Sequence, residues 1–482
     1  MRLSHLVGEG MRLIGDGAVD VGGLCADSRR VRPGELFAAL GGTQDDGRRY
    51  IADARAAGAV AVLGSGGTDG LGLPVVESGE PRRALALMAA TFFGAQPRCV
   101  VAVTGTNGKT STAVFTRQLW ETLGHPAASL GTLGVHAPGR HVAGSLTTPD
   151  AVTLQRLAAD LARQGVDHLA VEASSHGLDQ RRLDGLRLSA GAFTNLTRDH
   201  FDYHGTAEAY FAAKRRLFTE LLPEGVPVVL NADVPEFATL VGDARARRLD
   251  VIDYGRDARR LRLLGQELHE LGQEIEVELD GRRRRLHLPL VGDFQAWNAL
   301  AALGLVTATG GDLQQAAEAL SGLRGAPGRM ELVARRANGA PVFVDYAHTP
   351  DALEKALLAL RSHTVGRLVV VFGCGGDRDP GKRPVMGRIA RERADRVIVT
   401  DDNPRSEDPA WIRAAIMQTA GAAAIESDDR AAAIAEGVAM LRPGDVLLVA
   451  GKGHETGQTV AGVTHPFDDA AVCRAAAAGA AA

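Results

Sequence analysis

The segment from Cys99 to Leu123 constrains the fold of this chain more than any other part of the sequence. An apolar run, CVVAV, is followed by the glycine-containing loop TGTNGKTS and by a stretch with helical periodicity, Thr112 to Leu123. A strand, a loop and a helix in this order open a parallel α/β sheet. The backbone N–H groups of such a loop, together with the helix dipole, can bind triphosphate oxygens. We therefore predict an α/β fold with a nucleotide site at this loop.

The loop is predicted to contact ATP along its whole length. Lys109 would reach the β- and γ-phosphates, and Thr110 would bind a magnesium ion. The usual motif has glycine where this chain has Val103, so the flanking strand and helix carry the interpretation. The alternative is an ordinary glycine turn. The predicted phosphate-binding residues are Gly105, Thr106, Asn107, Gly108, Lys109, Thr110 and Ser111.

A carboxylate is expected to hold the same magnesium ion as Thr110. Glu172 directly follows the apolar run His168 to Val171, and the carboxyl end of a parallel strand lies at the edge where nucleotides bind. The alternative is that Glu172 is a solvated loop residue. We predict a ligand, because a polar cluster, SSH, begins two residues later.

Lys214 lies in a segment with the periodicity of an amphipathic helix, TAEAYFAAKRRLFTELL. One stripe at helical spacing contains Tyr210, Lys214, Leu217 and Leu221. The neighbouring Arg215 and Arg216 are predicted to face away from it. Burial disfavours the charged ammonium, and a neutral amine can act as a nucleophile or react with carbon dioxide to form a carbamate.

A carbamate at Lys214 would be an anionic oxygen ligand. His200 and Asp202 precede it in NLTRDHFDYHG, so one interpretation is a second magnesium ion between His200 and carbamylated Lys214. The other is a lysine that extends its amine to solvent beside a structural histidine. Spacing alone favours the second interpretation.

Lysine is rare in this chain, since only five of its 54 basic residues are lysine. A chain that uses arginine for nearly every surface cation is expected to keep lysine where a compact, titratable amine is needed. Lys355, on an apparent surface helix, is the one that we expect to have no functional role. The five are Lys109, Lys214, Lys355, Lys382 and Lys452.

Length predicts three domains, because 482 residues at roughly 150 per domain correspond to about three. Residues 1–97 are predicted to form a small α/β domain, and residues 98–326 a central domain around a P-loop-type parallel sheet. Residues 327–482 are predicted to form a Rossmann-like, doubly wound domain, because apolar runs alternate with helical stretches. These runs are 342–345, 368–372, 397–400 and 446–450. The final tail, 470–482, is assigned no function.

Residues 274–288 are predicted to form a β-hairpin around Asp280-Gly281. Its arginine run, 282–285, can face three glutamates across the turn, at positions 274, 276 and 278. We therefore expect a solvated cross-strand arrangement rather than an anion site.

Charge and composition exclude several classes of function. A net charge of −4 with 4% aromatic residues argues against nucleic-acid binding. The four cysteines are too far apart in sequence to suggest a zinc or redox pair, which is typical of the reducing cytoplasm. No apolar run is long enough for a membrane helix, and the first residues lack a secretory h-region. We expect a cytoplasmic protein, a monomer without membrane insertion.

A series of motifs follows along nearly the whole chain: TGTNGKT, LTTPD, VEASSHGL, NLTRDH, YFAAK, VDYAHTPDAL, GGDRDPGKRP, DDNPR and AGKGHE. In this order they resemble the motifs of the Mur ligases, ATP-dependent amide-forming enzymes of peptidoglycan synthesis, a process tied to cell shape and cell division. The resemblance implies an ADP-forming ligase that adds meso-diaminopimelate to UDP-N-acetylmuramoyl-L-alanyl-D-glutamate through an acyl phosphate. The implied partners are these small molecules and ATP, with magnesium at two sites.

The resemblance also implies roles for individual residues. Catalytic positions match Lys109, Glu172, His200 and Lys214. Magnesium ligands match Thr110, Glu172, His200 and Lys214, the last as a carbamate. Contacts to the ATP base and ribose match Asn298, Arg329 and Asp345. Contacts to the UDP-linked dipeptide match Ser28, Thr147, Thr148, Ser174, Gln180 and Arg182. Contacts to diaminopimelate match Arg378, Asp402, Asn403, Pro404, Arg405, Gly451 and Glu455.

Two positions depart from the family pattern. Thr43 stands where a histidine is usual, and Gly457 stands where an aromatic residue often follows GKGHE. We expect the second departure to alter local packing more than chemistry.

The amino acid that is added depends on Arg405. Its guanidinium can grip the far carboxylate of diaminopimelate in a bidentate pair, and L-lysine lacks this carboxylate. The alternative function within the family is therefore an L-lysine-adding ligase. The alternative role for Arg405 is a pair with Asp401, Glu407 or Asp408.

Two further functions remain open outside this assignment. A folylpolyglutamate synthetase-like ligase shares the central ATP-binding plan, but the predicted N-terminal domain and DDNPR argue against it. A regulatory P-loop NTPase would use Lys109, Thr110 and Glu172 as a switch, which leaves Lys214 unexplained.

Overall fold

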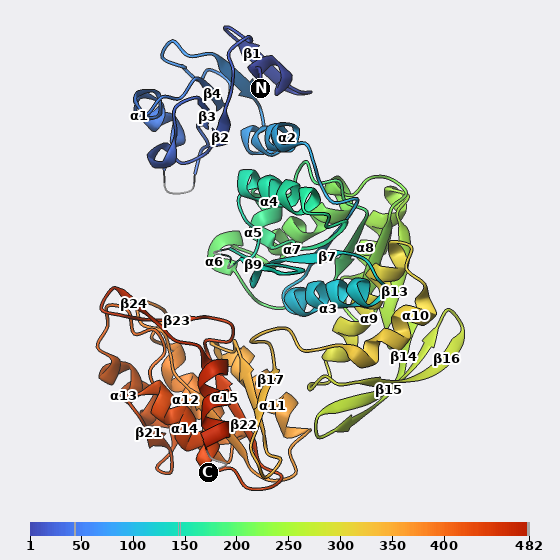
Figure 1. Cartoon of the computed structure of the whole chain (residues 1–482), viewed down its shortest axis with the longest axis vertical. Helices are drawn as coiled ribbons and strands as arrows, with labels where there is room; N and C mark the ends of the chain where they lie inside the picture. The colour runs from blue at the N-terminus through green and yellow to red at the C-terminus, as the bar shows by residue number, and fades with distance from the viewer. Residues whose placement is uncertain (43–44, 143, 145, 480–482) are drawn as a thin grey trace. The chain divides into compact units, whose positions relative to one another are not determined.

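The computed structural model describes residues 1–42, 45–142, 144 and 146–479 (Figure 1). Thr43 therefore lies outside the described residues. The chain divides into two compact units, Met1–Arg262 with Leu300–Ala316, and Leu263–Ala299 with Ala317–Ala482. Across the described ranges, no helix is both long and apolar enough to span a membrane.

The first unit begins with a sheet of five short strands in the order β1-β5-β4-β3-β2. The strands are β1 (Met11–Ile14), β2 (Gly23–Cys25), β3 (Glu35–Ala38), β4 (Ala61–Gly64) and β5 (Val75–Ser78). Helix α2 (Pro81–Phe93) covers one face, where Leu85 and Met88 join one apolar cluster. Helix α1 (Ile51–Ala56) packs against the other face through Ile51. The sequence-based prediction of an α/β fold at this end is confirmed.

A second sheet of the first unit carries strands in the order β13-β12-β11-β6-β10-β7-β8-β9. The strands from β13 to β7 are parallel, and β8 and β9 add antiparallel at one edge. Their bounds are β6 (Cys99–Thr104), β7 (Ala127–Gly131), β8 (Gly134–Ala137), β9 (Arg140–Val142), β10 (His168–Glu172), β11 (Ala190–Phe193), β12 (Pro227–Asn231) and β13 (Asp250–Gly255). The helices are α3 (Lys109–Thr122), α4 (Ala151–Arg163), α5 (Ser175–Asp179), α6 (Phe201–His204), α7 (Ala207–Arg216) and α8 (Phe237–Ala246), with a π-helical turn, Leu217–Leu221, after α7.

Helix α3 begins at Lys109, three residues before the apolar periodicity starts. Periodicity detects only the part of a helix that contacts a core. The first turn of α3 instead continues directly from the left-handed Gly108, so the end of the glycine loop is also the start of the helix.

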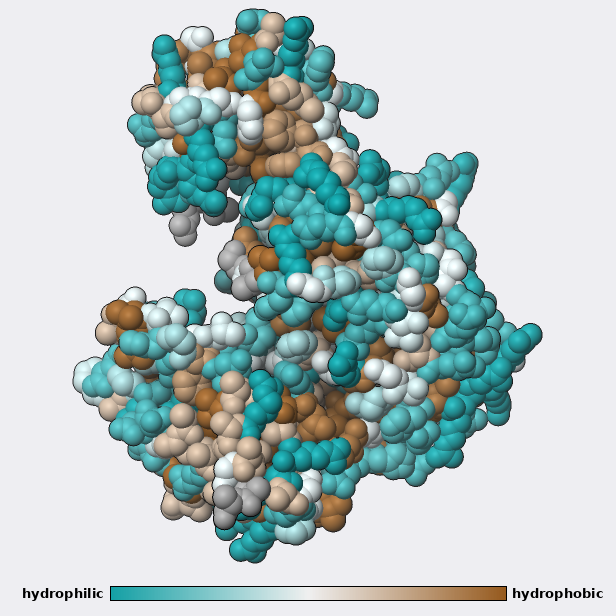
Figure 2. All heavy atoms as spheres, viewed as in Figure 1, coloured by the Kyte–Doolittle hydropathy of each residue, from teal (hydrophilic) through white to brown (hydrophobic). Residues whose placement is uncertain are grey.

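Three elements contain residues of both units or join them: β14 (Leu261–His269), α9 (Gln295–Ala308) and α10 (Leu313–Ala319). In the second unit, β15 (Gly272–Leu279) and β16 (Arg282–Leu288) form the predicted hairpin, with positive φ at Asp280 and Gly281. Arg283 lies 3.8 Å from Glu278, in the expected cross-strand arrangement. Hydrophilic side chains cover this part of the surface (Figure 2), as expected for a solvated charge run.

The second unit also contains a six-stranded sheet in the order β17-β18-β22-β19-β20-β21. The strands are β17 (Glu331–Arg335), β18 (Pro341–Asp345), β19 (Leu368–Phe372), β20 (Arg396–Val399), β21 (Ile425–Glu426) and β22 (Val446–Ala450), and a separate hairpin consists of β23 (Gly457–Val460) and β24 (Val463–Pro466). The helices are α11 (Pro350–Arg361), α12 (Lys382–Arg393), α13 (Pro409–Ala420), α14 (Arg430–Ala439) and α15 (Asp469–Gly479).

Helices cover both faces of this sheet, as the doubly wound prediction requires. Val370 and Phe372 pack in one apolar cluster with residues of α11, α12 and α13. Val369 and Val371 pack in another with residues of α14 and α15. A parallel strand buried on both faces is apolar throughout, which explains why β19 reads LVVVF.

The prediction that Arg216 faces away from the core is wrong. Its side chain is only 8% exposed and donates hydrogen bonds to the Asp184 carboxylate at 2.6 Å and to the Leu178 carbonyl at 2.7 Å. Helix α7 packs against α5 on this side, so it is buried along two stripes rather than one. Arg215 does point outward, where it pairs with Asp243.

Candidate active site

The loop between β6 and α3 folds back on itself around Lys109. The Lys109 amine donates to the carbonyls of Gly105 at 2.9 Å and Thr106 at 2.8 Å. Gly105 has φ 145°, and a Cβ there would overlap with Thr194 Oγ1, so only glycine fits. The loop therefore holds the Lys109 amine at the start of α3, and the first turn of a helix is a favourable place for an anion.

A second loop, which follows β11, holds the phosphate loop in place. Asn195 accepts from the backbone N–H of Thr106 at 2.8 Å through its carbonyl, and from that of Asn107 at 3.0 Å through its side chain. Thr194 Oγ1 donates to the Asn107 carbonyl at 2.6 Å. Thr194 and Asn195 were not predicted as site residues. The feature that could have identified them is that NLTRDH begins just after β11, which pairs with β6.

Glu172 lies at the carboxyl end of β10, next to the phosphate loop. It accepts a hydrogen bond from Thr110 Oγ1 at 2.9 Å and from the backbone N–H of Thr132 at 2.8 Å. Its side chain belongs to a residue only 2% exposed, so the solvated-loop alternative is wrong. A Cβ on Gly131 would overlap with this carboxylate, so glycine leaves room for it. A hydroxyl and a carboxylate brought together in this way fit the oxygen-ligand preference of magnesium.

Lys214 is buried, as its position on the apolar stripe predicts. The residue is 1% exposed, and its amine donates to the Gly105 carbonyl at 2.7 Å and lies 4.4 Å from the centre of the Tyr210 ring. Burial, and then the nearby Lys109 charge, hold the pKa of Lys214 well below its usual range. Among the described residues, no carboxylate lies within ion-pair distance of this amine. The alternative of an amine extended into solvent is therefore wrong.

His200 lies in a group of aromatic side chains beside Tyr210. Its ring centre is 4.8 Å from that of His176 and 6.2 Å from that of Tyr210, and its backbone has φ 53°. Burial, and then the nearby His200, lower the pKa of His176 to about 4. His204, which was not predicted, packs 5.3 Å from Tyr210, and within the described ranges its buried Nε2 has no hydrogen-bond partner. His200 and Lys214 thus both lie beside Tyr210.

Four of the predicted contacts to the UDP-linked dipeptide form one hydrogen-bonded network. Thr148 Oγ1 lies 3.0 Å from Ser174 Oγ, and its hydroxyl donates to the Glu172 carbonyl at 2.7 Å. Arg182 donates to the Thr148 carbonyl and to the Gln180 side chain, both at 2.7 Å. The network therefore connects the predicted substrate positions to the strand that carries Glu172.

The other two predicted contacts lie elsewhere in the first unit. Thr147 Oγ1 is 3.1 Å from Thr132 Oγ1, beside Glu172. Ser28 begins a short helical turn, Ser28–Arg30, after β2, and Asp27 caps that turn.

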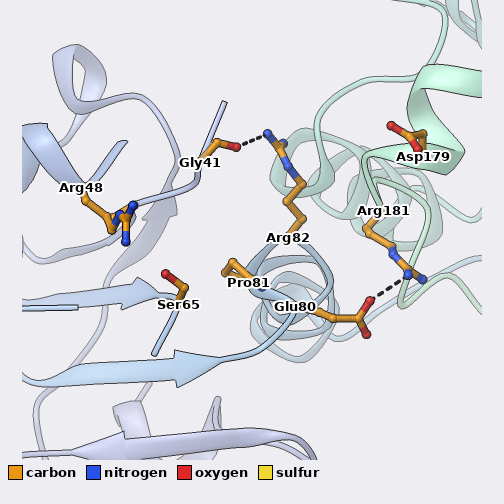
Figure 3. Close-up of a pocket in the computed structure, with 9 residues that line it drawn as sticks. Gly41, Arg48, Ser65, Glu80, Pro81, Arg82, Asp179 and Arg181 are labelled. Carbon is orange, nitrogen blue, oxygen red and sulfur yellow. Dashed lines mark hydrogen bonds and ion pairs between the residues drawn. The ribbon is translucent and has the colours of Figure 1, made fainter. Parts of the chain in front are cut away.

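A cavity of about 370 Å³ opens in the first unit, lined by residues of loops and helices, among them the start of α2 and the end of α5 (Figure 3). Three arginines line it: Arg48, Arg82 and Arg181. Arg82 donates to the Gly41 carbonyl at 2.7 Å, and Arg181 pairs with Glu80 at 2.7 Å. Arg82 and Arg181 were not predicted, because no local pattern distinguishes them in an arginine-rich chain. Arg181 does lie between the predicted Gln180 and Arg182.

In the second unit, Asp345 lies at the carboxyl end of β18. Its carboxylate accepts hydrogen bonds from the backbone N–H groups of Met330 at 2.6 Å and Ala347 at 2.9 Å. Burial raises the pKa of Asp345, and Arg329 opposes that shift. The Arg329 guanidinium lies 4.6 Å from the centre of the Tyr346 ring. Asn298 lies on α9, where its side chain donates to Gln295 at 3.0 Å.

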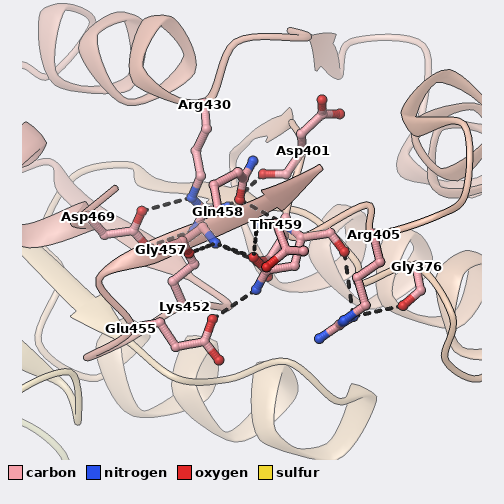
Figure 4. A network of polar contacts seen from close by, with 12 residues as sticks. Gly376, Asp401, Arg405, Arg430, Lys452, Glu455, Gly457, Gln458, Thr459 and Asp469 are labelled. Atoms are coloured by element: carbon pink, nitrogen blue, oxygen red, sulfur yellow. Dashed lines mark hydrogen bonds and ion pairs between the residues drawn. The ribbon is translucent and has the colours of Figure 1, made fainter. Parts of the chain in front are cut away.

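The DDNPR and AGKGHE segments meet at the carboxyl ends of β20 and β22 (Figure 4). The Asn403 side chain donates to Glu455 at 2.8 Å and accepts from the Lys452 amine at 3.0 Å. Lys452 is fully buried and was singled out only as one of five lysines. Gly451 has φ 119°, and a Cβ there would overlap with Asp402, so this position is restricted to glycine.

Arg405 bonds to backbone carbonyls and not to an acidic side chain of the described residues. Its NH1 group donates to the Gly376 carbonyl at 2.7 Å, and within the described residues it forms no ion pair with a carboxylate. The proposed rivals have other partners: Asp401 pairs with Arg413, and Glu407 pairs with Arg383. Asp408 caps α13 through the backbone N–H of Ala410. The alternative role for Arg405 is therefore wrong.

The remaining predicted residues surround this loop. Pro404 packs with its carbonyl against Gly376, where a Cβ would overlap with it. Arg378 is exposed and donates to the Asp377 carbonyl at 3.1 Å. Gly457 starts β23, where a Cβ would lie 2.7 Å from a Thr464 methyl group, so the departure from an aromatic residue fits local packing. Lys355 is an exposed residue paired with Asp351, as expected for a lysine without a role.

One further group within the described part of the chain has the composition of a metal site: His125, Asp167 and His168. It lies at the amino end of β10, at the opposite edge from Glu172. His168 Nδ1 is 2.6 Å from the Asp167 carboxylate, and the rings of His125 and Trp120 pack against His168. These contacts account for the group as a satisfied structural cluster.

Comparison with known proteins gives matches over most of the chain. The model described as "Mur ligase middle domain" matches residues 103–306, "Mur ligase, glutamate ligase domain" matches 328–453, and "Mur ligase family, catalytic domain" matches 20–92. UDP-N-acetylmuramoyl-L-alanyl-D-glutamate–2,6-diaminopimelate ligase of Mesorhizobium japonicum is 55% identical over 460 residues, which is 95% of this chain and 95% of that protein.

Solved structures of similar proteins also match most of the chain. A structure of UDP-N-acetylmuramoyl-L-alanyl-D-glutamate–2,6-diaminopimelate ligase has 33% identity and a TM-score of 0.75, and the match covers 100% of this chain and 99% of that one. Folylpolyglutamate synthase of Mycobacterium tuberculosis, in complex with ADP, has 19% identity and a TM-score of 0.62 and covers 76% of this chain and 91% of that one. At that identity the similarity concerns the fold alone.

Proposed function

The chain belongs to the Mur ligase family, and from this premise we propose that it is the ATP-dependent, ADP-forming ligase that joins meso-2,6-diaminopimelate to UDP-N-acetylmuramoyl-L-alanyl-D-glutamate in peptidoglycan synthesis. The observation that carries the proposal is Arg405, a guanidinium that no carboxylate of the described residues pairs with, in a loop held by buried polar contacts. Such a group fits the second carboxylate of a diamino acid. The names of the relatives supply the identity of the substrates, and the unpaired Arg405 gives a physical reason why the added amino acid would carry a second carboxylate.

The reaction begins with activation of a carboxylate. The γ-carboxylate of D-glutamate attacks the γ-phosphorus of ATP; the new O–P bond forms as the bond to the β-phosphate oxygen breaks, and ADP leaves. The main barrier is repulsion between two anions, which positive charge must offset. Lys109, held over the phosphate loop by Gly105 and Thr106, is the residue that we assign to this task.

The second step forms the amide. The amine of diaminopimelate attacks the carbonyl carbon of the acyl phosphate, and the tetrahedral oxyanion collapses with release of phosphate and loss of the amine proton. Arg405, Asn403 and Glu455 would hold the diamino acid for this attack, and their rigid placement reduces the entropic barrier. Burial raises the pKa of Glu455.

We assign magnesium to two places, the second of which rests on a modified lysine. Thr110 and Glu172 would hold one ion, because their side-chain oxygens already meet at 2.9 Å. His200 and Lys214, as a carbamate, would hold the other; an unmodified Lys214 ammonium could not be a ligand. When bound, magnesium neutralises phosphate charge. The buried amine without a carboxylate partner supports this assignment.

The pocket of Figure 3 is our candidate for the diphosphate of the UDP-linked substrate. Arg48, Arg82 and Arg181 line it, and arginine forks bind phosphate oxygens well. With this assignment, residues 1–97 bind the UDP substrate, 98–326 bind ATP and 327–482 bind the diamino acid. We propose a cytoplasmic monomer that acts on small molecules.

Product analysis tests the proposed function. The purified chain is incubated with ATP, magnesium and the UDP-linked dipeptide, and with either meso-diaminopimelate, L-lysine or L-glutamate plus a folate. Mass spectrometry is expected to show the UDP-linked tripeptide with diaminopimelate, in equal amount to ADP. A lysine product would favour the L-lysine-adding ligase, a folate product the folylpolyglutamate synthetase, and ADP without any ligated product a regulatory NTPase.

Lys109→Ala is expected to slow ATP turnover on the order of a thousandfold, because the variant loses the positive charge that offsets the repulsion between the carboxylate and the triphosphate. Binding of the UDP-linked dipeptide should persist, because its predicted contacts belong to other segments. Calorimetric titration and ADP release measure the two properties, with Lys355→Ala as the control. Loss of both binding events in a folded variant would show that the substrate assignments are misplaced.

A further inference from the structure

A buried ion pair joins the first residue of α14 to the first residue of α15, close to the DDNPR and AGKGHE segments. Arg430 is the first residue of α14, and Asp469 is the first residue of α15. Two guanidinium nitrogens of Arg430, Nε and NH2, each donate to a carboxylate oxygen of Asp469 at 2.7 Å. The side chains are 1% and 0% exposed, so the pair is shielded from water. Burial alone would lower the pKa of Arg430, but the Asp469 charge raises it above its usual value.

The same guanidinium also reaches two backbone carbonyls. NH1 donates to the Asp401 carbonyl at 3.2 Å (Figure 4), and NH2 donates to the Ala450 carbonyl at 3.0 Å. Asp401 follows β20 and begins DDNPR, and Ala450 ends β22 and begins AGKGHE. One side chain therefore ties together the two segments that carry Asn403, Arg405 and Glu455.

These segments need an external constraint. Asn403 and Arg405 both have positive φ, 46° and 54°; asparagine adopts this region readily, so the strain that the surroundings must hold lies mainly at Arg405. The Lys452 amine provides one constraint, because it donates to the Asn403 side chain at 3.0 Å and to the Gly457 carbonyl at 2.8 Å. Arg430 provides the other through the Asp401 and Ala450 carbonyls.

We propose that Arg430 and Asp469 are positioning residues for the incoming amino acid, which makes the first residue of the C-terminal helix a part of that site. The inference rests on the proposed function, because it takes DDNPR and AGKGHE as the segments that bind the diamino acid. Asp469 orients the guanidinium, and the guanidinium fixes the spacing of the two loops. The pair touches no substrate itself.

Lysine cannot replace Arg430 in this role. The planar guanidinium makes four hydrogen bonds to three partners: the Asp469 carboxylate and the carbonyls of Asp401 and Ala450. A lysine ammonium is a compact point charge and cannot reach all three partners at once. Asp469→Asn keeps the size of the side chain but removes the charge that holds the fork. Both changes should let the two loops shift relative to each other.

A control pair of the same kind lies at the opposite, amino-terminal ends of two strands of this sheet. Arg367, just before β19, donates through Nε to Asp445, just before β22, at 3.0 Å, and through NH2 to the Met440 carbonyl at 2.7 Å. This pair also ties a strand end to a loop, but at the amino ends of the parallel strands. Loss of either pair should lower stability, and only loss of Arg430–Asp469 should affect the diamino acid.

The test compares full-length Arg430→Lys and Asp469→Asn with Arg367→Lys and Asp445→Asn. The KM for meso-diaminopimelate is expected to rise by about tenfold or more in the first two variants, because small misplacements of a site are costly. The KM values for ATP and for the UDP-linked dipeptide should stay unchanged. The control variants should show a lower melting temperature with an unchanged KM for diaminopimelate.

Two results would overturn the inference: an unchanged KM for diaminopimelate in both Arg430→Lys and Asp469→Asn, or an equal rise in the control variants. If Arg430→Lys fails to fold, the more conservative Asp469→Asn carries the test, and hydrogen exchange of the Arg405 amide, bonded to Thr459 at 3.0 Å, provides a second readout. Faster exchange is expected, and unchanged exchange would count against the idea. A wild-type chain that ignores diaminopimelate would instead contradict the proposed function.

Discussion

Lys214→Ala is expected to reduce the ligation rate on the order of a thousandfold, because removal of one electrostatic group from a dry active site has effects of this size. The amine is buried against the Gly105 carbonyl and the Tyr210 ring with no carboxylate partner among the described residues. Its burial depresses its pKa, so the neutral form that reacts with carbon dioxide exists at lower pH than for an exposed lysine. Short carboxylic acids should restore part of the activity by taking the place of the carbamate.

The measurement is ADP and phosphate release by wild type and variant, with and without added acetate or formate. Lys355→Ala, at an exposed lysine, is the control and should be fully active. Depletion of carbon dioxide should inactivate the wild type, and recovery on readmission should be faster as pH rises, because the neutral amine then increases. An unmodified Lys214 ammonium in a crystal of the ATP-bound, active enzyme would sink the carbamate assignment.

Arg405 is expected to make the enzyme prefer meso-diaminopimelate over L-lysine on the order of a thousandfold in kcat/KM. With L-lysine the guanidinium would stay unpaired and would face an ammonium in place of a carboxylate, and a charge that a bound ligand covers without pairing costs several kcal/mol. Arg405→Ala should lose this preference and most diaminopimelate use, while ATP binding is preserved. Arg405 donates only to carbonyls in the present structure, so no internal ion pair has to be broken first.

Competition between the two amino acids at equal concentrations measures the preference directly. Arg393→Ala, which removes an exposed pair with Glu354 in the same unit, is the control and should change nothing. We would abandon diaminopimelate specificity if the wild type incorporated both amino acids equally. Unchanged diaminopimelate kinetics in Arg405→Ala would remove Arg405 from the site.

Much of the phosphate site could be predicted from local patterns. The order of strand, loop and helix placed Lys109 and Thr110, and the end of an apolar run placed Glu172 beside them, because parallel strands end at a common edge. The apolar stripe of α7 predicted the burial of Lys214. Spacing could not supply its chemical state, which is why the family resemblance was needed for the carbamate.

Residues that depend on partners distant in sequence were missed. Arg216 was placed outward because its own helix shows one apolar stripe, and the Asp184 carboxylate that buries it lies in a different segment. Arg430 and Asp469 are 39 residues apart and follow no motif. Arg82 and Arg181 are hidden by the many arginines of the chain. A sequence pattern can identify the buried face of a helix or a turn. Ion pairs between residues distant in sequence can be identified only once the fold is known.

The Gly105 carbonyl has a consequence for the order of events, because the amines of Lys109 and Lys214 both donate to this one oxygen. When Lys214 becomes a carbamate, its nitrogen carries one N–H in place of an amine, so the carbonyl loses one of its two amine donors while Lys109 remains. An isotope label on this single carbonyl would therefore report, as a shift of its infrared band, whether the phosphate loop has been made ready before any substrate arrives.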